Sequence, residues 1–182
     1  MYKVKCAAVN RELRKKQLFD TGNEQALKKM SLFLDYVLSD KLRYTNTRIK
    51  QIHTSFNKVA SDVTEGRRSI GEITDFLRDE YGVELIGLES ENRIRPAWFR
   101  SDYVSGVYAA SDALSIILIY VLVHQYKFSE EKCNKVIKSI NDIAGSVNLG
   151  YITEAEIKEC LYDEEGLVVE KLEGVRKLGE VI

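Results

Sequence analysis

The chain has 182 residues, of which 45% are apolar and 30% are charged, and its formal net charge is −1. This composition is typical of a globular protein with a sizeable core, and it excludes low-complexity and strongly acidic or basic chains. Three cysteines at unrelated spacings form neither a disulfide framework nor a metal-binding motif, which favours a reduced, cytoplasmic compartment.

The sequence argues against export and membrane insertion. Lys3 and Lys5 precede only a short apolar stretch, unlike the start of a signal peptide. The most apolar run, residues 113–123, is too short to cross a bilayer, and we expect it to form a buried helix.

Charge is unevenly placed along the chain. Residues 1–68 carry 15 Lys and Arg against 7 Asp and Glu, whereas residues 85–182 carry 11 against 16. The basic first part is compatible with an acidic or nucleic-acid partner, and a solvated helix surface accounts for it equally well.

The first 40 residues predict two helices. Residues 5–19 can form a basic amphipathic helix, with Cys6, Val9 and Leu13 on one side. Thr21 and Glu24 then have the spacing of a capping box, which predicts a new helix over about residues 22–40. We therefore treat residues 1–24 as a separate basic N-terminal segment.

Two further helices complete a first unit, residues 25–85. Thr45 can cap the start of a helix whose apolar residues recur at helical spacing, and Gly66 can end it. These apolar residues are Ile49, Ile52, Phe56, Val59 and Val63. A short third helix follows, with a capping box formed by Ser69 and Glu72 and an end at Gly82.

The same pattern then returns. Residues 26–85 align without a gap on residues 110–169, a separation of 84 residues, and 17 of the 60 aligned positions are identical. A second three-helix unit is thus expected over residues 106–170, with Cys133 and Cys160 as core residues. The segment between the units, residues 86–105, reads as a partly extended connector, and residues 171–182 form a tail. The predicted fold class is all-α, with two tandem related three-helix units.

No residues combine into a recognisable active site. His53 and His124 lie outside any metal-binding spacing and have no cysteine or carboxylate at a spacing typical of a catalytic triad. We expect both to be surface or partly buried imidazoles. Glu72 and Glu156 recur as helix caps, so we predict no catalytic residues, no metal site and no cofactor.

Two groups of residues are candidates for contact with a partner. Arg93, Arg95, Trp98 and Arg100 gather basic and aromatic side chains in the connector, and Arg67 and Arg68 precede the third helix. The helices of residues 46–80 can also be read as a helix-turn-helix, in which Arg67 and Arg68 touch a nucleic-acid backbone.

The positions at which the two units differ predict a second surface. Asp35, Ser39 and the pair Arg67-Arg68 become Ile119, Val123 and the pair Tyr151-Ile152. We interpret these positions as exposed, so that Ile119, Val123, Tyr151 and Ile152 form a face for self-association, as in a homodimer, or for docking within the chain.

A resemblance to known proteins rests on three stretches of the second unit. They are Tyr120 to Phe128, Gly150 to Ile157, and Leu161 to Gly166. This pattern resembles small helical proteins of Firmicutes phages and mobile elements, and the chain is similar in size and character to anti-CRISPR proteins of Clostridium-type elements that inhibit Cas9. The resemblance implies a non-enzymatic protein of the host bacterial cytoplasm that binds and inhibits a Cas9–guide RNA complex. A phage-encoded DNA-binding regulator and a structural or assembly protein stay open as alternatives.

Overall fold

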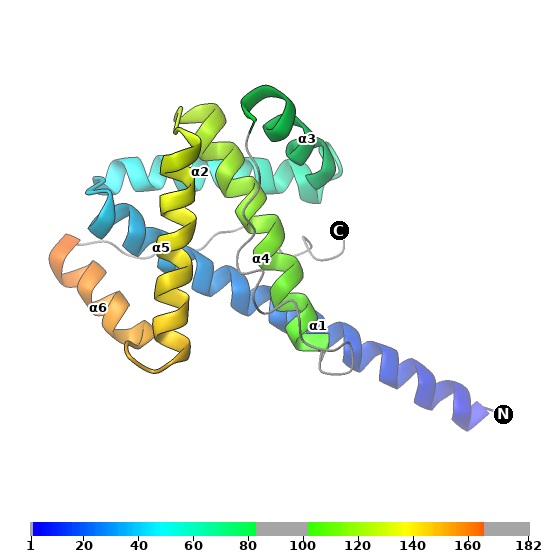
Figure 1. The fold of residues 1–182 in the computed structure, drawn as a ribbon. Coiled ribbons are helices and arrows are strands. Elements are labelled where there is room, and N and C mark those ends of the chain that lie inside the picture. The colour runs from blue at the N-terminus through cyan, green and yellow to red at the C-terminus, as the bar shows by residue number, and fades with distance from the viewer. Residues whose placement is uncertain (1, 83–101, 166–182) are drawn as a thin grey trace.

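The computed structural model describes residues 2–82 and 102–165, with the side chains of residues 10–82 and 102–162. Within these ranges 86% of the residues are helical and no strand is present, so the all-α fold class is confirmed. The described residues form six α-helices (Figure 1), which are α1 (Tyr2–Tyr36), α2 (Asn46–Thr64), α3 (Ile70–Tyr81), α4 (Asp102–Tyr120), α5 (Glu130–Asn148) and α6 (Glu154–Glu165). The part of the connector before residue 102, including Pro96, and the tail lie outside the described residues.

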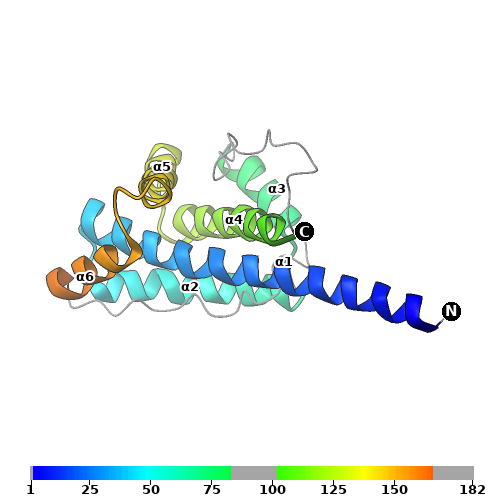
Figure 2. The ribbon, with the colours of Figure 1, turned by 90° about the horizontal axis from the view of Figure 1, so that it is seen from below.

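The expected break after residue 20 is wrong, because α1 is one helix of 35 residues. The Thr21 hydroxyl does not cap a new helix. It donates instead to the backbone oxygen of Gln17, 2.7 Å away, one turn earlier in the same helix. Residues 10–18, here called the arm, extend past the other helices (Figure 2). Every side chain of the arm is exposed.

The two halves of the chain, residues 2–82 and 102–165, have matching element bounds. α1 and α4 each continue into a short π-helical turn, η1 (Val37–Lys41) and η4 (Val121–Gln125). The bounds of η1 and η4, of α2 and α5, and of α3 and α6 all differ by 84 residues, which is the spacing found in the sequence. We call two residues 84 positions apart counterparts; that the halves superpose as repeats stays a prediction.

The helix ends follow the predicted capping chemistry with one exception. Ser69 accepts from the Glu72 amide and the Glu72 carboxylate accepts from the Ser69 amide, and Thr153 and Glu156 make the same exchange. Gly66 and Gly150 have φ values of 72° and 75°, as expected of glycines that end helices. Thr45 occupies the cap position of α2, but its side chain makes no capping hydrogen bond there.

The halves are held together where α1 crosses α4, and two glycines make that crossing possible. A methyl group placed on Gly22 would overlap the carbonyl oxygen of Tyr103, and one placed on Gly106 would overlap the carbonyl oxygen of Phe19. At each glycine the backbone of the opposite helix therefore packs directly against the glycine backbone, in the space that a side chain would fill. Gly22 and Gly106 are counterparts, so the contact is reciprocal.

The short third helices are exchanged between the halves. α3 packs against α4, and α6 packs against α1 (Figures 1 and 2). Both have fully buried apolar side chains, which are Ile73 and Leu77 in α3 and Ile157 and Leu161 in α6. Buried side chains of both halves consequently form one hydrophobic core, in which the predicted apolar stripe of α2 takes part.

The apolar composition of α4 and η4 is explained by this core. Residues 102–125 are long and apolar enough to cross a membrane by length and composition alone, but 67% of the most apolar window is buried inside the protein. The expectation of a buried helix over residues 113–123 is thus confirmed. Cys133 is also buried, as predicted, and burial raises the pKa of its thiol to about 11.

Candidate functional site

The two halves differ most in chemistry at the turns that lead into their third helices. Gly66 and Gly150 donate to Val63 and Val147 over 3.1 Å, and the next residues, Arg67 and Tyr151, donate to carbonyls five residues back. The backbone of the two turns is thus bonded alike. We call residues 65–78 the α3 corner and residues 149–162 the α6 corner.

In the α3 corner, the charge of Arg67 is balanced by neighbouring carboxylates. Its guanidinium lies 2.6 Å from a carboxylate oxygen of Asp62 and also pairs with Glu65. The hydrogen bond from Ser61, and then the charge of Arg67, hold the pKa of Glu65 below its usual value. Two carboxylates already occupy this arginine, which weakens it as an anchor for phosphate, and its predicted contact with a partner stays a prediction.

Arg68 is held differently, by an aromatic ring of the other half. Its Nη1 donates to the Tyr120 hydroxyl over 2.7 Å, and its guanidinium carbon lies 5.5 Å from the centre of that ring. The hydrogen bond raises the pKa of Arg68. The guanidinium is exposed and carries five N–H donors, so most of its donors are left for other contacts.

Tyr120 belongs to a cluster of rings that joins α3 to α4 and η4. The His124 ring stacks on Tyr120 at 5.1 Å between centres, and Phe76 meets both rings edge-on at 5.4 to 5.7 Å. The Tyr81 hydroxyl lies 3.2 Å from Nδ1 of His124, within hydrogen-bond distance. We call Arg68 and these four residues the Arg68 face.

The Arg68 face occurs only once in the described part of the chain. The counterparts of Arg68, Phe76 and His124 are Ile152, Cys160 and Asp40. Neither a cation nor a ring stands at these positions on the other side of the molecule. His124 is half-buried, as expected, although its role in binding α3 to η4 was not visible in the sequence.

The α6 corner exposes large apolar side chains where the α3 corner is charged. Leu149 is 70% exposed, Tyr151 is 77% exposed and Tyr162 is 65% exposed. Their counterparts are Glu65, Arg67 and Arg78, each of which makes an ion pair. Since the same turn accepts charged residues, nothing in the backbone requires apolar ones here, and exposed apolar groups of this kind often mark an interface.

Ile119 and Val123 do not belong to that surface, and the expectation that they are exposed is wrong. Both are only 2% exposed, and their counterparts Asp35 and Ser39 are buried as well. The side chains therefore offer nothing to a second copy. Of the predicted self-association residues, Tyr151 is exposed and Ile152 is half-buried against the core.

Asp35 is buried because it pairs with a histidine. A carboxylate oxygen of Asp35 hydrogen-bonds to Nε2 of His53 on α2, and both side chains are almost fully enclosed. The expectation of a surface or partly buried imidazole at His53 is therefore wrong. The counterparts of Asp35 and His53 are Ile119 and Ile137, both buried. This joint exchange of a polar pair for an apolar pair was a signal in the sequence that could have revealed the contact.

The connector candidates Arg93, Arg95, Trp98 and Arg100 lie outside the described residues. Their role as contact residues stays a prediction. They follow α3 directly along the chain, with only 11 residues between Tyr81 of the Arg68 face and Arg93.

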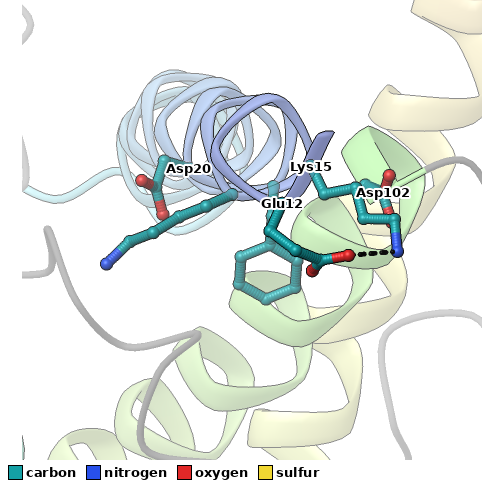
Figure 3. A pocket seen from close by; sticks show the side chains of 6 residues that line it. Glu12, Lys15, Asp20 and Asp102 are labelled. Atoms are coloured by element: carbon teal, nitrogen blue, oxygen red, sulfur yellow. Dashed lines mark hydrogen bonds and ion pairs between the residues drawn. The ribbon is translucent and has the colours of Figure 1, made fainter. Parts of the chain in front are cut away.

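A shallow cavity of about 360 Å³ lies where the arm meets the start of α4 (Figure 3). Glu12, Lys15, Lys16, Phe19, Asp20 and Asp102 line it. Lys15 is already paired with Glu12 at 3.1 Å, so part of the charge is neutralised inside the cavity. Among the described residues no three His, Cys, Asp or Glu side chains are grouped to hold a metal ion.

No protein family profile matches the chain, and no curated protein and no solved structure matches it.

Proposed function

We propose that this chain is a non-enzymatic binding protein that docks on a host Cas9–guide RNA complex and inhibits it. The resemblance of the second unit to proteins of phages and mobile elements supplies the class of partner. The docking surface is the Arg68 face, and the observation that carries this assignment is the fixed position of Arg68 over Tyr120.

The chemistry of the Arg68 face suits a protein partner that carries RNA. Arginine is enriched among the energetically important residues of protein interfaces, and it also pairs well with phosphate. The Tyr120 ring holds the guanidinium in place before binding, which lowers the entropy that an interface side chain loses on association. The Cas9–guide complex offers surfaces built to hold nucleic-acid backbones, where such a group would fit.

The proposal is tested by capture and by inhibition. The purified chain should retain Cas9–guide complex on a column and reduce DNA cleavage at near-equal molar amounts. Arg68→Gln should weaken capture roughly tenfold or more, because it removes an arginine that the partner would cover and shield from water in the complex. Arg78→Gln is the matched control, since Arg78 belongs to the same α3 corner and is also exposed, but pairs with Asp75 and Asp79 instead.

Two outcomes would overturn the proposal. One is a wild-type chain that neither captures nor inhibits the complex, and the other is equal loss of capture in both variants. A gel shift on bare duplex DNA, with affinity falling steeply as salt rises, would instead support a DNA-binding regulator.

A further inference from the structure

The exposed apolar side chains of the described residues gather in two places. Seven large ones are exposed, and five of these lie on the arm or on the α6 corner. On the arm, Leu13 is 55% exposed and Leu18 is 40% exposed. The arm is a short stretch of helix without neighbouring helices, and such stretches gain stability when a partner covers them. The exposed apolar groups of the α6 corner would likewise be stabilised by a covering partner.

The charges around these two surfaces are opposite in sign. The arm carries four cations, Arg11, Arg14, Lys15 and Lys16, against the single acid Glu12. On the α6 corner, Glu154, Glu156 and Glu159 stand against Lys158. Contact between two α6 corners would bring like charges together, whereas contact between an arm and an α6 corner would pair opposite ones.

The arm cannot reach the α6 corner of its own chain. α6 is bound to the other end of α1, where Lys29 lies 3.3 Å from Glu154. From Leu13 to Lys29 a helix rises about 24 Å, and α1 is continuous over that distance. Figure 2 shows the arm and α6 at opposite ends of α1. A partner that brings an arm to the corner must therefore be another molecule.

We propose that the arm of one copy docks on the α6 corner of a second copy, and that two such contacts close a two-fold dimer. Leu18 covers Leu149 and Tyr151. Arg11 and Arg14 lie seven and four residues before Leu18, on the same side of the helix, and face the carboxylates of α6. A reciprocal contact of this kind closes on itself, so the assembly stops at two chains. It does not depend on the partner proposed above, and it uses neither Arg68 nor the rings beside it.

Sedimentation velocity over a range of protein concentrations tests this dimer. The wild-type chain should form dimers that dissociate as salt rises, because the contact pairs opposite charges. The double variant Leu149→Glu, Tyr151→Arg carries the residues found at the α3 corner, where the same turn accommodates them. Its dimer dissociation constant should rise roughly tenfold or more. A wild-type chain that stays monomeric at high concentration would overturn the proposal.

Charge reversal separates a direct contact from an indirect effect. Arg11→Glu with Arg14→Glu should also disrupt the dimer, and adding Glu159→Lys should restore part of it. The control Lys58→Glu with Lys138→Glu changes the net charge equally at two exposed positions on α2 and α5, outside the arm and the α6 corner. It should leave the dimer intact. A dimer that survives the arm reversal, or one that the added reversal does not strengthen, contradicts the arm contact.

Discussion

Asp35 and His53 are two ionisable side chains that are buried in the core and hydrogen-bonded to each other. Removing one partner of such a pair leaves a polar group enclosed without its hydrogen bond, which is more costly than never having had the pair. Ile119 and Ile137 occupy the counterpart positions and are equally buried. The second half therefore fills the equivalent space in the core with two apolar side chains.

This comparison gives a prediction for stability. His53→Ile alone should lower the free energy of unfolding by about 3 to 5 kcal/mol, because Asp35 stays buried and loses its hydrogen bond with His53. The double variant Asp35→Ile, His53→Ile should return to within about 1 kcal/mol of the wild type or exceed it. Urea unfolding followed by circular dichroism measures both. A double variant as unstable as the sum of the single ones would show that the pair is not replaceable.

At the scale of helices, the sequence predicted most bounds and faces correctly. Capping residues, terminal glycines and helical periodicity are local signals, and they indicated α2, α3, α5 and the start of α6. The failure was α1, in which Thr21 and Glu24 were read as a capping box that starts a new helix. A threonine that caps a helix and a threonine whose hydroxyl bonds within a helix look alike in sequence. Extending the alignment to the Gly22 and Gly106 counterparts would have favoured the second interpretation.

The glycine crossing predicts opposite effects for two substitutions. Gly106→Ala should lower the free energy of unfolding by about 1 to 3 kcal/mol, because its methyl group overlaps the backbone of Phe19. Gly145→Ala is the control inside α5, where an added methyl group meets nothing within 4 Å. It should raise the free energy of unfolding by about 0.5 to 1 kcal/mol, since alanine favours a helix. Equal effects in thermal unfolding would contradict the close crossing.

At the scale of the whole molecule, the exchange of third helices was beyond the reach of local signals. Periodicity shows that α3 and α6 have an apolar face, but not which helix covers it. The same limit explains why Asp35, Ser39, Ile119 and Val123 were assigned to the surface. Their burial depends on α2 and on the opposite half, and a charged residue is assumed to be exposed unless its partner is known.

The exchanged helices predict that neither half is stable alone. Residues 1–87 and 88–182, produced separately, should each show weak and non-cooperative unfolding, because α3 and α6 lose the helices that bury them. Mixed in equal amounts, they should combine and recover the helix content of the intact chain. Circular dichroism and size-exclusion chromatography measure this recovery. Cooperative unfolding of either half by itself would support the two independent units expected from the sequence.

The crossing at Gly22 also means that a small rotation of α1 produces a large displacement at its N-terminal end. The backbone contact with α4 is the pivot, and the 20 residues before it form one continuous helix about 30 Å long. A rotation of only about 10° at the pivot would move the far end of that helix by about 5 Å. Small repacking between the two halves is thereby amplified at the far end of the helix, where the cations of the arm lie.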